Sequence, residues 1–89
     1  MPEVLLSATF VRQFRKLGGE TQRRLRDGLA VLADDPSKPR PGADIKRLAG
    51  TDPPKHRLRV GDWRIVYAID GQTVRILEVF ARGRGYRLD

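Results

Sequence analysis

The chain contains no cysteine among its 89 residues, and it has a single histidine. The absence of cysteine excludes a disulfide framework and any thiolate metal site. One histidine without cysteine also argues against structural zinc, so we expect no metal and no cofactor. No apolar run approaches the ~20 residues that cross a bilayer. Residues 1–6 lack a basic segment ahead of a long apolar one, so we expect a cytoplasmic protein that binds no membrane.

Positive charge is what the chain has in excess. It carries 18 Lys and Arg against 11 Asp and Glu, a net charge of +7, and 14 of the 18 are arginine. Such a surplus indicates an acidic partner, with nucleic acid ahead of an acidic protein. The alternative is a basic surface that only keeps the protein in solution. At this length, with 39% hydrophobic residues, we expect one globular domain over residues 1–89.

The first half of the chain has the period of a helix. A short apolar strand at residues 4–6 precedes Ser7, a candidate N-cap. One helix then ends at Gly18-Gly19, and a second runs from residue 20 or 21 to about Ala33. Each carries an apolar stripe at i, i+4 and i+7, formed by Phe10, Phe14 and Leu17, then by Leu25, Leu29 and Leu32. The stripes predict core packing, and the arginines between them a solvated face or a partner surface.

Residues 36–54 are rich in proline and predict a long loop, either functional or a simple connection. Within it, the piece 44–48 allows Ile45 and Leu48 to pack inward while Lys46 and Arg47 face water. The period then changes to two, which predicts strands near 56–60, 63–69 and 74–81, with turns at Gly61-Asp62 and Asp70-Gly71. We therefore predict an α+β fold of order β-α-α-β-β-β, a mostly antiparallel sheet with both helices on one face.

The usual catalytic motifs are missing, and what remains is a cluster of cations. Arg57 and Arg59 share one side of a strand, and Arg64 follows the next turn on an otherwise apolar face. An arginine there needs an anion, either Glu78 or a ligand phosphate. Three further side chains follow the last strand: Arg82, Arg84 and Tyr86.

A converged arginine cluster is suited to stabilising the charge of a phosphoryl transition state, and an RNA supplies its own 2′-hydroxyl nucleophile. The neutralisable side chains near the cluster are Lys55, His56, Glu78 and Tyr86. His56 alternates with Leu58 and Val60, so we interpret it as a half-buried strand residue rather than a base.

The run 55–67, KHRLRVGDWRIVY, resembles the RelE/ParE superfamily of type II toxins, and the tail 82–86, RGRGY, resembles its RelE branch. The lead-in 46–50, KRLAG, is similar to the family's approach to the central strands. The likeness covers nearly the whole chain. It implies a small sheet with two helices, cleavage of messenger RNA on the ribosome to a cyclic phosphate, and a toxin–antitoxin hetero-oligomer with a cognate antitoxin.

The resemblance also implies roles for individual residues. Lys55 and Arg57 match a basic pair, Arg64 the arginine at the scissile phosphate, Arg82 or Arg84 the transition-state arginine, and Tyr86 the stacking tyrosine. The RNA-binding residues are expected to be Lys46, Arg47, Arg59 and Arg87. The chain departs from some relatives in having Arg57 in place of a lysine base, which leaves Lys55 or Tyr86 to accept the proton.

Two rival functions share these features. A ParE-like inhibitor of DNA gyrase has the same fold and no hydrolytic step, although it needs no arginine and tyrosine tail. An inactive, basic RNA-binding relic is the other, and it predicts salt-sensitive RNA binding without cleavage.

Overall fold

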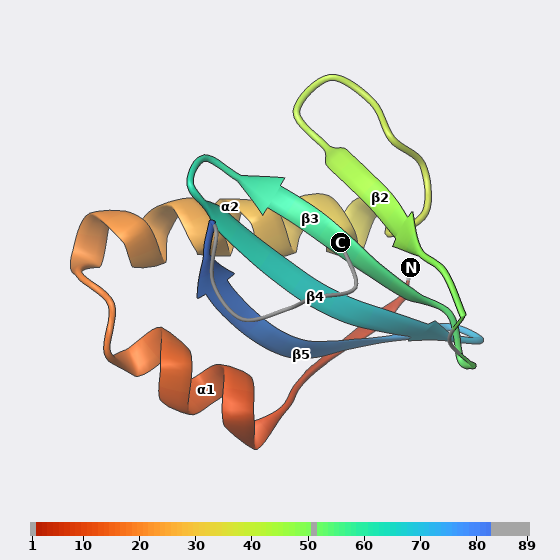
Figure 1. Ribbon diagram of the computed structural model, residues 1–89, viewed down its shortest axis with the longest axis horizontal. Coiled ribbons are helices and arrows are strands. Elements are labelled where there is room, and N and C mark those ends of the chain that lie inside the picture. The colour runs from red at the N-terminus through yellow and green to blue at the C-terminus, as the bar shows by residue number, and fades with distance from the viewer. Residues whose placement is uncertain (1, 51, 83–89) are drawn as a thin grey trace.

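Seven elements form the protein in the computed structural model, which describes residues 2–50 and 52–82 (Figure 1). The helices are α1 and α2, and the strands are β1 to β5. In chain order the elements are β1 (Glu3–Leu6), α1 (Ala8–Arg15), α2 (Gly19–Asp34), β2 (Asp44–Leu48), β3 (Lys55–Val60), β4 (Trp63–Asp70) and β5 (Thr73–Ala81).

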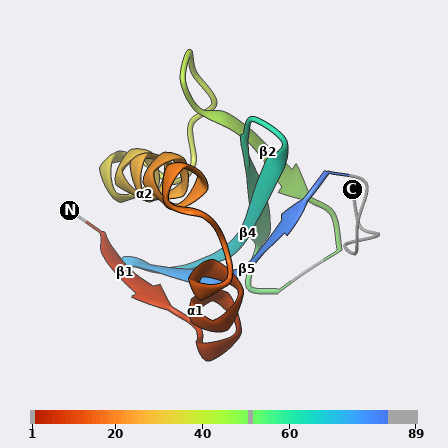
Figure 2. The same cartoon turned by 90° about the vertical axis from the view of Figure 1, so that its left-hand side faces the viewer.

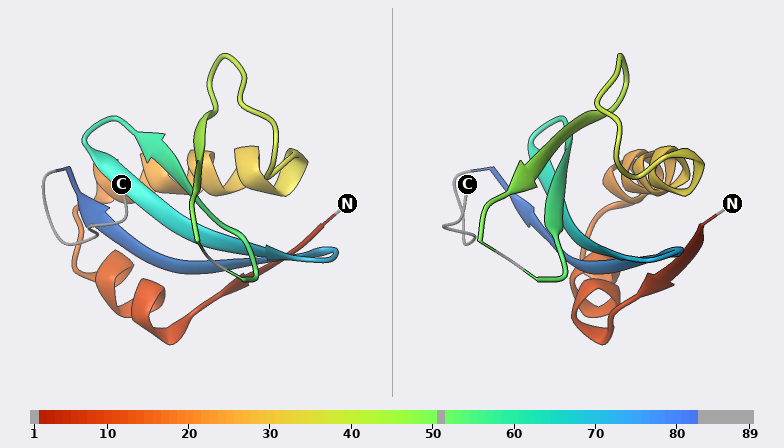
Figure 3. Two further views of the ribbon diagram at one scale, coloured as in Figure 1. Left: turned by 45° about the vertical axis from the view of Figure 1, so that its right-hand side comes forward. Right: turned by 90° about the vertical axis from the view of Figure 1, so that its right-hand side faces the viewer.

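The strands make one sheet of order β1-β5-β4-β3-β2. All neighbours are antiparallel except β1, which pairs in parallel with β5. The prediction of an α+β fold with a mostly antiparallel sheet is confirmed, and so is the central position of the last two strands. Helix α2 crosses one face, and α1 lies beside β5 at the edge of the sheet (Figures 2 and 3).

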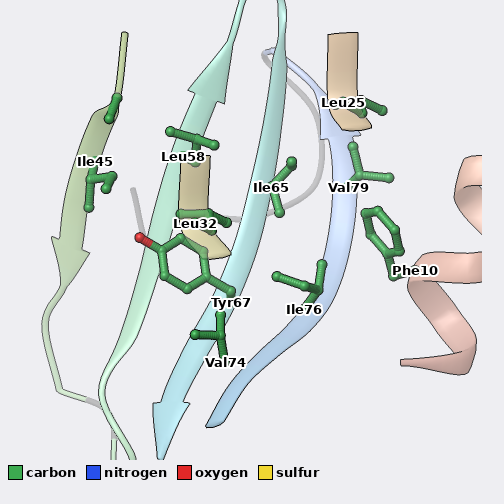
Figure 4. Close-up of a cluster of buried hydrophobic side chains, with 11 residues drawn as sticks. Phe10, Leu25, Leu32, Ile45, Leu58, Ile65, Tyr67, Val74, Ile76 and Val79 are labelled. Atoms are coloured by element: carbon green, nitrogen blue, oxygen red, sulfur yellow. The ribbon is translucent and has the colours of Figure 1, made fainter. Parts of the chain in front are cut away.

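The core fills the space between the helices and the sheet. Phe10 of α1 and Leu25 and Leu32 of α2 are at most 1% exposed. They meet the buried side chains Leu58, Ile65, Tyr67, Val74 and Ile76 of the sheet (Figure 4). The helical stripes therefore pack as the sequence predicts. Leu29 and Phe14 lie at the edge of this core and are partly buried.

The ends of the helices follow capping chemistry. The Ser7 hydroxyl accepts a hydrogen bond from the Phe10 N–H at 2.9 Å and is the N-cap of α1, as predicted. Helix α1 ends at Arg15, before the predicted Gly18-Gly19 stop, so Leu17 lies beyond it. The C-terminal end of α2 is covered by Arg40, whose guanidinium donates to the carbonyls of Val31 and Asp35, both at 3.1 Å.

The long loop predicted for residues 36–54 contains a strand. Residues 44–48 form β2, which pairs with β3 so that Ile45 lies opposite Leu58 and Leu48 opposite Lys55. Ile45 and Leu48 are buried, as predicted, while Lys46 and Arg47 are exposed. Because side chains alternate along a strand, Ile45 and Leu48 lie on opposite faces of the sheet.

The predicted alternation of β5 is wrong after Ile76. Val66 pairs with Glu78 and Tyr67 with Ile76, so Leu77 is an extra residue with no partner on β4. This β-bulge shifts the alternation by one, and the buried residue after it is Val79 rather than Glu78. Glu78 and Phe80 therefore lie on the face opposite to Val74 and Ile76.

Candidate functional site

The candidate site is the sheet face turned away from α2, which we call the outer face. Within the described residues, no helix covers it, and it faces the viewer in Figure 1. Directly paired residues of an antiparallel sheet share a face, so the strand register sorts the outer face into rows. Three neighbouring rows cross β2, β3, β4 and β5: Asp44-Arg59-Arg64-Phe80, Lys46-Arg57-Val66-Glu78 and Leu48-Lys55-Ala68-Arg75.

These rows combine a small apolar centre with a cationic surround. Leu48, Val66 and Ala68 are 1–3% exposed. Around them stand six cationic side chains and two carboxylates: Lys46, Lys55, Arg57, Arg59, Arg64 and Arg75, with Asp44 and Glu78. The described part of the outer face is therefore strongly positive around a small buried apolar centre.

Asp44 holds two of the arginines in place. Its carboxylate lies 3.5 Å from Arg57 Nη1 and 4.0 Å from Arg59 Nη1. The Arg57 guanidinium also donates to the Asp44 carbonyl at 3.3 Å. The Arg57 side chain is only 14% exposed, whereas that of Arg59 is 45% exposed. Arg57 is thus a largely enclosed cation and Arg59 a more exposed one. No sequence signal singled out Asp44, because its role depends on pairing between β2 and β3.

The structure brings together part of the predicted set. Lys55, Arg57, Arg59, Arg64 and Lys46 all lie on the outer face. Arg82 directly follows β5, and its N–H donates to the Asp62 carbonyl at 2.6 Å, at the end of the sheet where Arg64 lies. Three other predicted residues, Arg84, Tyr86 and Arg87, fall outside the described residues.

Arg47 does not join this group. It pairs with His56 across β2 and β3, so it lies on the helix-covered face, near the open cleft lined by both residues. Lys46 and Arg47, both predicted to bind RNA, therefore lie on opposite faces of the sheet, because neighbouring strand residues point to opposite faces.

His56 also faces away from the candidate site. It is 8% exposed and stacks on Tyr67, with ring centroids 5.4 Å apart and an interplanar angle of 17°. Burial, reinforced by the charge of Arg47, lowers the pKa of His56 below its usual range. His56 is predicted to be a half-buried strand residue; it lies on β3 and is buried more fully than predicted, on the face opposite to the candidate site.

The stacking partner of His56 connects the sheet to the loop after α2. The Tyr67 hydroxyl donates to the Pro36 carbonyl at 2.7 Å. Burial, with a smaller contribution from Asp35, raises the pKa of Tyr67 far above its usual value. Tyr67 therefore stays neutral and has a structural role. The described ionisable side chains on the three rows of the outer face are Asp44, Lys46, Lys55, Arg57, Arg59, Arg64, Arg75 and Glu78.

The low pKa of His56 predicts a pH-dependent stability. The unfolded chain binds a proton near pH 6.5, and the folded protein does so only at lower pH. The contribution of neutral His56 to the free energy of unfolding is therefore complete above about pH 6.5, and it is lost as the pH falls from there through the folded-state pKa. Urea midpoints measured between pH 8 and pH 5 should decrease, and the decrease should be smaller in His56→Gln. Equal slopes for the two proteins would contradict this assignment.

In the described part of the chain, no helix is both long and apolar enough to cross a membrane. The same part holds no group of three or more His, Cys, Asp or Glu side chains arranged to bind a metal ion.

The fold has clear counterparts among solved structures. It is similar to the archaeal RelE–RelB complex from Pyrococcus horikoshii OT3, with a TM-score of 0.80 and 28% identity over 94% of this chain and 98% of that chain. It is also similar to the RelBE2 toxin–antitoxin complex from Mycobacterium tuberculosis, with a TM-score of 0.74 and 26% identity over 92% and 100%. The isolated Escherichia coli RelE toxin shares the fold at 23% identity, with a TM-score of 0.70 over 96% and 88%. No curated protein sequence matches significantly.

These neighbours define the class: the protein has the fold of a RelE-like toxin. Residues 4–86 match the family described as ParE toxin of type II toxin-antitoxin system, parDE. The chain therefore belongs to the ParE toxin family, within the RelE/ParE superfamily that its central strands resemble.

Proposed function

We propose that this toxin is a metal-independent endoribonuclease that cleaves messenger RNA on the ribosome. The observation that carries the proposal is the outer face, where Arg57, Arg59 and Arg64 stand on adjacent strands beside Lys55. Such a cluster matches a polyanion, and arginine forks bind phosphate in two-point contacts. The similarity to RelE structures over nearly the whole chain supports the same reading.

The chemistry follows from the substrate's own groups. The RNA 2′-oxygen forms a bond to phosphorus while the bond from phosphorus to the 5′-oxygen breaks. The 2′-hydroxyl proton passes to a base, and the 5′-oxygen leaves and takes up a proton from solvent water, which yields a 2′,3′-cyclic phosphate and a free 5′-hydroxyl. Loss of the base's proton to solvent closes the balance. Arg64, with Arg57 and Arg82, stabilises the extra negative charge on the phosphoryl oxygens. Arg84 is a further candidate for the Arg82 role.

We propose that Lys55 or Tyr86 is the base that accepts the 2′-hydroxyl proton. Lys55 lies on β3, in the row next to that of Arg57. Tyr86 falls outside the described residues and is proposed to stack on a base. Lys46, Arg59, Arg87 and, from the sheet's other face, Arg47 are proposed to hold the RNA backbone.

A second candidate function is inhibition of DNA gyrase, favoured by the match to the ParE toxin family. Two assays with purified toxin distinguish the two functions. One is primer extension on a defined messenger RNA with and without ribosomes, and the other is a gyrase supercoiling assay. We expect ribosome-dependent cuts and unchanged supercoiling. Loss of supercoiling without any cut would replace the first function by the second, and salt-sensitive RNA binding alone would indicate an inactive relic.

We further propose that a cognate antitoxin binds the two-helix side of this protein and its sheet edge. The P. horikoshii and M. tuberculosis neighbours are complexes of toxin with antitoxin. On this chain, an apolar cavity of ≈ 440 Å³ lies between α1 and α2, lined by Leu6, Phe14 and Leu29, with Arg15 and Arg26 also in its lining. The Arg26 guanidinium stands 5.9 Å from the centre of the Phe14 ring. An amphipathic helix with acidic flanks fits such a groove.

The charge of this groove gives a direct prediction. Replacing Arg15 and Arg26 together by Glu should weaken the toxin–antitoxin complex about tenfold or more, chiefly through slower association. Lys38→Glu, a single charge reversal in the loop after α2, should leave the dissociation constant unchanged. Surface plasmon resonance at two salt concentrations measures both. A complex that is lost only on deletion of residues 83–89, and is indifferent to the groove variants, would contradict this placement.

A further inference from the structure

The bulge in β5 decides which residues of that strand reach the outer face. Before it, Val74 and Ile76 are buried on the helix-covered side, and after it Val79 is. A regular strand has a strict period of two, which would carry Glu78 and Phe80 to the helix-covered side with Ile76. The extra residue Leu77 reverses this assignment.

The reversal completes the outer face on its β5 side. It places Glu78 in the row of Arg57 and Val66, and Phe80 opposite Arg64. The pairing continues past Ala81, because the Arg82 N–H donates to the Asp62 carbonyl at 2.6 Å. The path of the chain into Arg82 therefore depends on the register that the bulge sets.

Helix α1 and the residue before it hold the bulge. The consecutive carbonyls of Ile76 and Leu77 both accept from Ser7, from its N–H at 2.9 Å and from its hydroxyl at 2.6 Å. The Val79 N–H donates to the Gln13 side-chain carbonyl at 2.7 Å. Strand β1 ends at Leu6, so this stretch of the β5 edge has α1 beside it instead of a strand. Backbone groups need partners, and Ser7 and Gln13 supply them.

We propose that Gln13 is a positioning residue for the outer face. Its carbonyl takes the Val79 N–H and thereby keeps Leu77 as the extra residue, which directs Glu78 and the chain into Arg82 toward the cationic rows. Gln13 lies on α1, at the sheet edge, and acts through β5 rather than through contact with RNA. The inference rests on the proposed cleavage function for its effect on activity.

Ser7 is less suited to a test, because its hydroxyl also caps α1 and its loss would weaken the helix. Gln13 offers a matched control in Gln22, whose side-chain amide donates to the Phe14 carbonyl at 2.9 Å. Both glutamines make one side-chain bond to a backbone group, but only Gln13 bonds to β5. Gln13→Glu keeps an oxygen acceptor at the same reach, so it is the conservative variant.

The experiment compares wild type, Gln13→Ala, Gln13→Glu and Gln22→Ala by NMR and by ribosome-dependent cleavage without antitoxin. Cross-strand contacts of Val66 with Glu78 and of Tyr67 with Ile76 report the register, and hydrogen exchange of the Val79 amide reports its bond. In Gln13→Ala we expect fast Val79 exchange, loss of the Val66–Glu78 contact and about 10- to 100-fold slower cleavage. Gln13→Glu should restore all three, and Gln22→Ala should resemble wild type.

Each result decides the inference. Slow cleavage in Gln13→Ala with an unchanged register would overturn it, as would an unchanged register with normal cleavage. If Gln13→Ala does not fold, Gln13→Asn, which keeps the amide but not its reach, replaces it with the same expectation. If the wild-type protein cuts no messenger RNA, the proposed function fails separately, and the NMR comparison alone decides whether Gln13 sets the register.

Discussion

Arg64→Ala should slow messenger RNA cleavage by about 10²- to 10³-fold while leaving the protein folded. Arg64 stands directly opposite Arg59 on the outer face, in the row next to Arg57. A fixed donor aimed at the charge that develops in a transition state contributes a factor of this size. Single-turnover cleavage on programmed ribosomes measures it, and circular dichroism checks the fold.

Two variants make this result specific. Arg64→Lys keeps the charge but loses the two-point fork, so an intermediate rate is expected. Arg23→Ala removes the same charge from α2, where the arginine is 60% exposed and bonded to Glu20, and should cleave at the wild-type rate. If Arg64→Ala and Tyr86→Ala both remain fully toxic in growing cells, the site is elsewhere.

Phe10→Ala should lower the free energy of unfolding by about 3–5 kcal/mol. The Phe10 ring is 1% exposed, and its centroid lies 5.7 Å from that of Phe14. It fills the space between α1 and the sheet, beside Ile76 and Val79 (Figure 4). Small domains have about 5–15 kcal/mol of stability, so this variant should melt far below wild type. Urea unfolding and thermal melts followed by circular dichroism measure the change.

The control for Phe10 lies four residues earlier. Leu6 is 49% exposed, and Leu6→Ala should change the stability by about 0.5 kcal/mol or less. Phe10→Leu, which keeps most of the volume, should fall between the two. A loss below about 1 kcal/mol for Phe10→Ala would show that α1 is not held to the sheet by this ring.

Much of the fold is readable from local patterns. The stripes Phe10 and Phe14, then Leu25 and Leu32, have the period of a helix, and both helices form with these residues turned inward. The alternation around Leu58 and Ile65 and the turn signals between the strands likewise give β3, β4 and the start of β5. These features depend on residues close in sequence, so their periodicity is visible without any tertiary contact.

The candidate site is readable only in part. The alternation of β3 correctly groups Arg57 with Arg59, and the turn that follows brings Arg64 beside them. Arg47 goes to the other face because β2, absent from the predicted order, fixes its direction. Asp44, which holds Arg57 and Arg59, belongs to the same unexpected strand. The roles of Arg84, Tyr86 and Arg87 remain proposals.

A basic α+β fold, most of the residues of its core and the cations of its central strands follow from the amino-acid sequence alone. The tertiary structure alone decided the pairing of β2 and the face on which Glu78 and Phe80 lie. The reason is the range of the interactions: the bulge at Leu77 is held by Ser7 and Gln13, 70 and 66 residues away from their partners in the chain. Local alternation has no information about hydrogen bonds that form only when α1 packs against β5.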